Sequence, residues 1–160
     1  MRISWIVVAV VVWLLDRGSK LFVVSAFSLG EERRVLPVFS WVRLQNQGAA
    51  FSFLDDAGGW QRWLFVALAL VFAIYLVAEL RRLPANGRLL GWAYSLVLGG
   101  ALGNMWDRLV DGHVVDFILV HWGHHYFPAF NVADSAISVG AALWIFAMLR
   151  EWYHDRGRVR

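Results

Sequence analysis

Two aspartates in apolar surroundings, Asp116 and Asp134, are the residues whose context most clearly indicates chemistry. Asp116 lies in Val114-Val115-Asp116-Phe117, and Asp134 lies in Phe130-Asn131-Val132-Ala133-Asp134-Ser135. An ionised Asp costs free energy at membrane depth, so a carboxylate in such a segment is a candidate for function. Two carboxylates held together share one proton, so that one can act as an acid while the other acts as a base. The pattern predicts paired-carboxylate chemistry.

A purely structural interpretation of the two aspartates stays open at this point. Asn131 is of a type that caps helix N-termini, and Asp134 follows it by three residues. A carboxylate at that position is stabilised by the positive end of the helix dipole. Under this interpretation each Asp only ends a helix.

The composition indicates an integral membrane protein. The chain has 160 residues, of which 59% are hydrophobic and 17% are charged, whereas soluble domains average about 45–50% apolar and about 25% charged residues. We therefore expect a mostly α fold in one membrane domain, residues 1–160. The absence of Cys excludes disulfides and thiolate chemistry. The net charge of +3 comes from Arg residues at segment ends, which indicates membrane orientation and not nucleic-acid binding.

Four segments are long and apolar enough to be predicted as transmembrane helices, because about 20 helical residues cross a bilayer. The predicted spans are residues 3–27, 60–79, 89–108 and 134–150. A cleaved signal peptide is the alternative for the first span. Asp16, Arg17 and Lys20 directly after its apolar run disfavour that alternative.

The segments between the spans are assigned to the two sides of the membrane by their basic residues. Arg residues are frequent in the loop 80–88 and in the tail 151–160, so the positive-inside rule makes both termini cytoplasmic. Loops 28–59 and 109–133 are then periplasmic. Within the first of these, residues 37–44 have the alternation of a strand, and residues 49–51 are predicted to begin a short interfacial helix.

Several polar residues are predicted to lie near the two aspartates. Asp16 and Lys20 are spaced i, i+4 on one helix face, either beside the reactive centre or as an ion pair at the membrane surface. Asn104, Asp107 and Arg108 share one face of a helix end at i, i+3 and i+4, and either brace a carboxylate or end a span. Asn46 either binds an extended peptide or forms a turn. The glycines of the segment 99–103 have a GxxxG spacing, which allows helices to approach closely.

Other common chemistries find little support in the sequence. The HExxH, GxSxG, Walker A and GxGxxG motifs are absent. His121, His124 and His125 have a spacing that could hold a metal, but we favour an ordinary interfacial loop. Ser135 and Ser138 have no Lys or His at a useful spacing, so we expect them to pack or to bond to backbone carbonyls.

Four blocks of the sequence, taken together, resemble the bacterial lipoprotein signal peptidases, also called signal peptidase II. They cover the whole chain in the order of that family. The blocks are Asp16-Arg17-Gly18-Ser19-Lys20, Gln45-Asn46-Gln47-Gly48-Ala49-Ala50-Phe51, Gly99-Gly100-Ala101-Leu102-Gly103-Asn104-Met105-Trp106-Asp107-Arg108, and Val115-Asp116-Phe117 with Phe130-Asn131-Val132-Ala133-Asp134-Ser135.

The resemblance implies an intramembrane aspartic endopeptidase of the bacterial inner membrane, without a metal or an organic cofactor. Its substrates would be prolipoproteins carrying diacylglycerol on the Cys after the cleavage site, and its inhibitor would be the cyclic peptide globomycin. Asp116 and Asp134 match the catalytic dyad of the family. The supporting motif positions are matched by Asp16, Lys20, Asn46, Gly48, Asn104, Arg108, Asn131 and Ala133.

A small membrane transporter or proton-relay protein is the alternative function. Such a protein also places ionisable groups inside a helical bundle, but it needs them to link both faces of the membrane. Here the polar residues are predicted to lie toward one face, and residues 63–78 contain no charged residue.

Overall fold

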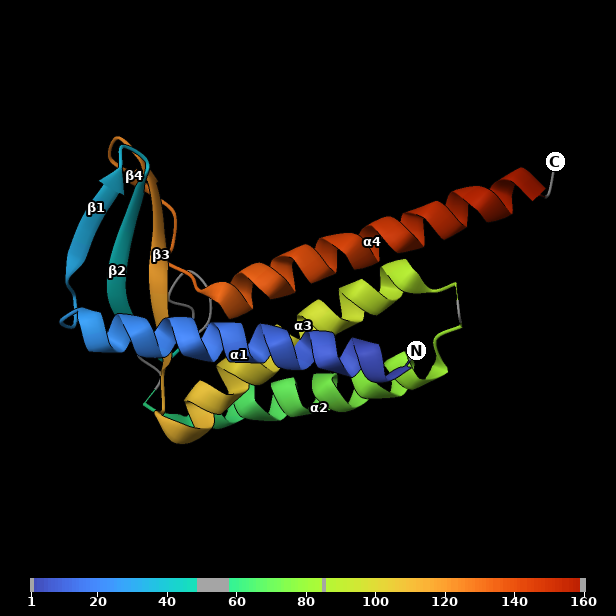
Figure 1. Ribbon diagram of the computed structural model, residues 1–160, viewed down its shortest axis with the longest axis horizontal. Coiled ribbons are helices and arrows are strands. Elements are labelled where there is room, and N and C mark those ends of the chain that lie inside the picture. The colour runs from blue at the N-terminus through green and yellow to red at the C-terminus, as the bar shows by residue number, and fades with distance from the viewer. Residues whose placement is uncertain (1, 49–57, 85, 159–160) are drawn as a thin grey trace.

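The computed structural model describes residues 2–48, 58–84 and 86–158. Four helices and four strands make up this part of the chain (Figure 1). The elements in chain order are α1 (Arg2–Ala26), β1 (Glu32–Leu36), β2 (Phe39–Asn46), α2 (Trp60–Arg82), α3 (Arg88–Val110), β3 (Val114–Trp122), β4 (His125–Tyr126) and α4 (Val132–Arg158). The fold is therefore mostly helical with a small sheet, as the sequence predicts.

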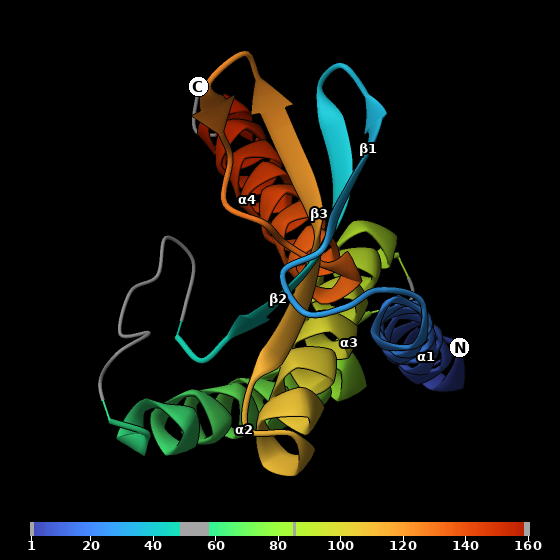
Figure 2. The ribbon, with the colours of Figure 1, turned by 90° about the vertical axis from the view of Figure 1, so that its left-hand side faces the viewer.

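Helix α3 is the central helix of the bundle. It packs against α1, α2 and α4, and Figure 2 shows these three helices arranged around it. Its buried Tyr94 and Leu98 contact a core that includes Leu76 and Leu80 of α2 and Ala9 of α1. Residues near the end of α3 can therefore contact three other helices.

Glycines of α3 allow the close approach of its neighbours, as the GxxxG spacing predicts. A methyl group at Gly100 would meet the Ala133 carbonyl of α4, and one at Gly103 would meet the Asp16 carboxylate of α1. On the α4 side, Gly140 leaves room for the Ala93 carbonyl of α3. These contacts bring the start of α4 close to both α1 and α3.

The four strands form one antiparallel sheet in the order β1-β2-β3-β4 at one end of the bundle (Figure 1). Asn46 pairs with Val114 and Leu44 pairs with Asp116 across β2 and β3. Side chains of opposed residues point to the same face of a sheet, so Asn46 and Asp116 are diagonal neighbours on one face.

The first part of β3, from Val114 to Phe117, is buried on both faces, although it lies in a segment predicted only as a loop. Val115 and Phe117 pack on Val23 of α1, whereas Val114 and Asp116 face a cavity beside α4. A stretch buried on both faces lacks the apolar–polar alternation by which strands are recognised, so this part of the strand carries no such signal in the sequence.

The other boundaries differ modestly from expectation. The predicted strand 37–44 is β2, but Pro37 lies in the turn that joins it to β1, a strand that was not predicted. Helix α4 extends to Arg158, beyond the predicted end of the span at residue 150. The short helix predicted to begin at residues 49–51 lies outside the described residues.

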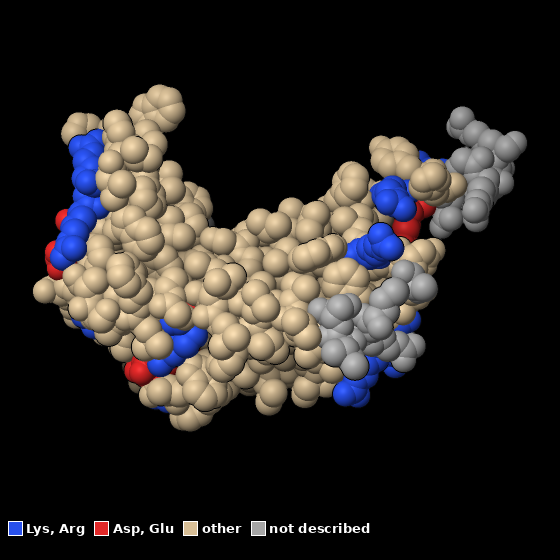
Figure 3. Space-filling model, in the orientation of Figure 1, with Lys and Arg blue, Asp and Glu red and all other residues tan. Residues whose placement is uncertain are grey.

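In the described part of the chain, two helical segments, Trp60–Arg82 and Val132–His154, are long and apolar enough to cross a membrane. Figure 3 shows Lys and Arg side chains gathered at the two ends of the molecule, with an uncharged surface between them. Helices α1 and α3 carry buried charged residues near the sheet. The expectation that these two helices also span the membrane stays a prediction.

Gly100→Ala tests the close approach of α3 and α4. We expect a loss of about 1–3 kcal/mol of stability, as in other overpacked cores, because the new methyl group meets backbone that cannot rotate away. The measurement is the thermal unfolding of the purified protein in detergent. Gly18→Ala in α1 is the control, because a methyl group there meets nothing within 4 Å. Equal stability of both variants would show that the close approach is unimportant.

Candidate active site

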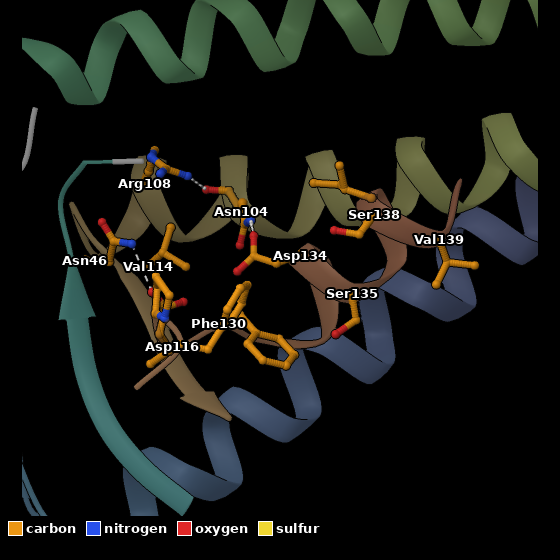
Figure 4. A pocket seen from close by; sticks show the side chains of 14 residues that line it. Asn46, Asn104, Arg108, Val114, Asp116, Phe130, Asp134, Ser135, Ser138 and Val139 are labelled. Atoms are coloured by element: carbon orange, nitrogen blue, oxygen red, sulfur yellow. Dashed lines mark hydrogen bonds between the residues drawn. The ribbon is translucent and has the colours of Figure 1, made fainter. Parts of the chain in front are cut away.

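A cavity of about 550 Å³ contains both predicted aspartates. Its walls come from the end of β2, from β3, from α3 and from the start of α4 (Figure 4). Apolar side chains such as Phe127, Phe130 and Val139 form much of the lining. The two carboxylates therefore lie in a mostly apolar space, which strengthens electrostatic interactions within it.

Asp116 is held by amide side chains on both of its oxygens. Asn46 Nδ2 donates to Oδ2 at 2.9 Å, and Asn131 Nδ2 donates to Oδ1 at 2.7 Å. The residue is only 3% exposed. Burial, followed by the charge of Asp134, raises the pKa of Asp116 to about 6, whereas the two amide hydrogen bonds lower it. A buried carboxyl with a pKa raised in this way is a candidate for acid–base chemistry.

Asp134 lies in the first turn of α4, where it also takes part in capping that helix. Its backbone N–H donates to Asn131 Oδ1 at 2.9 Å, and its Oδ2 accepts from the Asn131 N–H at 3.3 Å. This reciprocal pair is a capping box. Asn104 Nδ2 of α3 donates to the other oxygen, Oδ1, at 2.7 Å. The capping interpretation is thus correct for Asp134, but Asp116 lies within a strand and caps no helix.

Asn131 connects the two aspartates. Its Oδ1 accepts the N–H of Asp134, and its Nδ2 donates to Asp116 Oδ1. The side chain is fully buried. One amide therefore fixes the position of a strand carboxylate relative to that of a helix carboxylate.

Behind the cavity, Lys20 lies between two acidic residues. Its Nζ is 2.7 Å from Asp16 Oδ2 and 2.6 Å from Asp107 Oδ2, and all three side chains are about 1% exposed. The same Nζ donates to Asn104 Oδ1 at 3.0 Å, which orients the amide so that its Nδ2 faces Asp134. The Asp16–Lys20 pair is therefore inside the protein and beside the cavity, and not an exposed ion pair at the membrane surface.

Asp16 also binds the beginning of α4, because its Oδ1 accepts the Ala133 N–H at 2.9 Å. This amide is one of the unpaired donors at a helix N-terminus. The Asp16 carboxylate thus gives this amide a hydrogen-bond partner and holds α4 against α1.

Arg108 connects α3 to the chain beyond β2. Its Nη2 donates to the Gly48 carbonyl at 2.6 Å, and its guanidinium lies 4.9 Å from the centre of the Phe65 ring. Asn46 Oδ1 accepts the Gly48 N–H at 2.9 Å. Asn46 therefore forms the predicted turn and also contacts Asp116, whereas its binding of an extended peptide stays a prediction.

All the residues predicted to surround the aspartates lie in this one network. Asp107, which was predicted to share a helix face with Asn104 and Arg108, pairs with Lys20 behind the cavity. Sequence reasoning left Ser135 and Ser138 outside the site, but both line the cavity. Ser135 Oγ donates to the Asn131 carbonyl at 2.9 Å, as expected of a hydroxyl that bonds to backbone.

The histidines of the segment 121–125 lie in and beside the sheet. His121 is buried, with Nε2 3.2 Å from Ser40 Oγ and its ring near that of Tyr126. Within the described ranges, no three His, Asp or Glu side chains are grouped so that they could hold a metal ion.

Comparison with known proteins identifies the family. A sequence model described as signal peptidase (SPase) II matches residues 8–150. The chain belongs to the signal peptidase II family. Members of this family are hydrolases that cut peptide bonds, so the transporter alternative is not supported.

The signal peptidase II assignment agrees with individual relatives. The chain is 51% identical over 151 residues to the lipoprotein signal peptidase of Pseudomonas putida. The alignment covers 93% of this chain and 88% of the relative. It is 53% identical over 143 residues to the lipoprotein signal peptidase of Shewanella pealeana. That alignment covers 89% of this chain and 84% of the relative. A bacterial membrane enzyme solved by the in meso method at 2.3 Å resolution has a TM-score of 0.83 at 31% identity, over 92% of this chain and 88% of that one.

Lys20→Met tests the buried ion cluster. We expect a loss of about 3–5 kcal/mol of stability, because Asp16 and Asp107 keep their buried charges without the partner between them. Arg82→Met breaks the exposed pair with Glu79 and is expected to cost under about 1 kcal/mol. Chemical unfolding in detergent measures both. Similar losses in the two variants would contradict this account of Lys20.

Proposed function

We propose that this chain is an intramembrane aspartic endopeptidase that removes signal peptides from diacylglyceryl-modified prolipoproteins and cuts before the lipidated Cys. The observation that carries the proposal is that Asp116 and Asp134 line one cavity and are joined through Asn131. The names of the relatives support a lipoprotein substrate. Neither a metal nor an organic cofactor is part of the proposed mechanism.

The proposed reaction begins with one proton on the pair, carried by Asp116, whose raised pKa supports this assignment. Asp134 takes a proton from a water molecule as the water oxygen attacks the scissile carbonyl carbon, and Asp116 donates its proton to the carbonyl oxygen. The resulting gem-diol then collapses. Asp134 gives its proton to the leaving nitrogen, the C–N bond breaks, and a gem-diol hydroxyl returns a proton to Asp116.

The supporting residues act by holding the two carboxyl groups in place. Asn46 and Asn131 donate to Asp116, and Asn104 donates to Asp134. Asp16 and Lys20 hold Ala133 and Asn104. Positioning of this kind contributes to catalysis because a small displacement of reacting groups has a large effect on rate.

The proposed topology has four spans and cytoplasmic termini in the bacterial inner membrane, with the cavity toward the periplasm. The C-terminal parts of α2 and α4 and the start of α3 lie at the end of the molecule away from the sheet (Figure 1). They carry Arg81, Arg82, Arg88 and Arg150, which supports this orientation by the positive-inside rule. Acyl chains of the substrate would then stay in the bilayer while the scissile bond reaches the cavity. We propose that globomycin blocks the same cavity.

Asp116→Asn and Asp134→Asn test the dyad. We expect each substitution to lower the cleavage rate by about 10²–10⁴-fold, because each removes a group that transfers a proton. The measurement is cleavage of a diacylglyceryl-modified prolipoprotein by the purified enzyme in bilayers. Asp111→Asn is the matched control, since this partly exposed carboxylate pairs with Arg17. Cleavage near the wild-type rate by either dyad variant would refute the mechanism.

The pH dependence of cleavage tests the role of Asp116. Because its pKa is raised to about 6, the pair keeps its proton below this pH and loses it as the pH rises. We expect kcat/KM to fall as the pH rises through a midpoint of about 6. Asn46→Ala removes a hydrogen bond that lowers this pKa, so the midpoint is expected to move to higher pH.

The control for the pH profile is Asn86→Ala, a substitution in the connector between α2 and α3. Its midpoint should match that of the wild type. An unchanged midpoint in Asn46→Ala would mean that the titrating group is not Asp116.

A further inference from the structure

A second cavity lies between α1 and α2, near the end of the bundle away from the sheet. It has a volume of about 610 Å³ and is lined by Val7 and Val11 of α1 and by Val77 and Leu80 of α2, with Arg81 at its end. Helix α1 packs mainly on α3 and only weakly on α2, which leaves this groove between them. Its volume is within the range of about 300–1,000 Å³ that is usual for ligand sites.

The groove combines an apolar wall with a single cation. Val7 is 52% exposed and Val11 is 46% exposed, so the wall is open to whatever surrounds the helices. Among the described residues, Arg81 makes no ion pair or hydrogen bond, whereas the adjacent Arg82 is 3.4 Å from Glu79. An occupant with an apolar chain and an anionic head would match both parts of the groove.

The wall residues favour a flexible chain over another helix. Helices that pack in membranes bring Gly, Ala and Ser to the contact so that the backbones approach closely. This groove is instead lined by Val, Ile and Leu. Acyl chains can adapt to such an irregular surface, and they are the molecules that surround a membrane enzyme.

We propose that the groove between α1 and α2 binds one phospholipid with an anionic headgroup. An acyl chain lies along Val7, Val11 and Val77, and the phosphate pairs with Arg81. The site is separate from the cavity of Asp116 and Asp134 and does not depend on the proposed reaction. It would hold α1 and α2 together where the protein itself provides little contact.

Native mass spectrometry of the full chain from detergent tests this site. The probes are phosphatidylglycerol and phosphatidylcholine with identical acyl chains. Arg81→Gln is expected to weaken phosphatidylglycerol binding about fivefold, the contribution of one basic residue near an anionic headgroup. It should weaken phosphatidylcholine binding less, because the choline cation offsets the charge of the phosphate in that lipid, and Arg81→Lys should restore the difference. Arg82→Gln, one residue away and outside the groove, is the matched control.

The apolar wall is tested separately. Val11→Trp fills the groove and is expected to weaken binding of both lipids, whereas Val71→Trp on an exposed face of α2 outside the groove should have no effect. Retained peptidase activity establishes that each variant is folded, and Val7→Phe replaces Val11→Trp if the latter is inactive.

Three results would overturn the proposal. Equal losses in Arg81→Gln and Arg82→Gln would mean that the whole basic end attracts lipid without a site. Unchanged lipid binding in the active groove-filling variant would place the acyl chain elsewhere. A dimer that dissociates on filling the groove would make this face a contact between two copies of the chain.

Discussion

The buried contacts of Lys20 hold together the parts of the molecule from which the cavity is built. A single ammonium group lies between Asp16 of its own helix and Asp107 of α3, and it also binds Asn104. Removing such charges from water is costly, and only complete pairing makes the arrangement tolerable. Since Asp16 also accepts the Ala133 N–H at the start of α4, three helices meet at one ionic cluster. This cluster therefore determines how the two carboxylates of the cavity are positioned.

Structural and chemical roles coincide in the same atoms around the cavity. Asn131 caps α4 and fixes Asp116, while Asp134 closes the capping box and faces the cavity. Asn46 forms a turn and binds the same aspartate. An interpretation of these residues as ordinary helix caps and turns is therefore correct but incomplete. In this chain the helix cap and the turn that end secondary-structure elements also orient the polar groups of the site.

Much of the site could be predicted because its residues are unusual for their surroundings. Asp116 and Asp134 are conspicuous in apolar segments, and the i, i+4 spacing of Asp16 and Lys20 predicts their contact. The partnership of Lys20 with Asp107 depends on how α1 packs on α3, which no local pattern reports. Strand β3 was missed for a related reason. Its first four residues are buried by α1 on one face and by the cavity side on the other, and both faces are determined by tertiary structure.

The pairing of β2 with β3 limits how this chain can change in length. The register is shifted once, between Trp41 and Leu44, and then brings Asn46 opposite Val114. A deletion or insertion of one residue between this irregularity and Asn46 would reverse the faces of the strand that follows it. Asn46 would then point away from Asp116, toward the side on which Phe117 packs against α1. Natural variation in length is therefore expected at the turn between β1 and β2, where added residues leave this register intact.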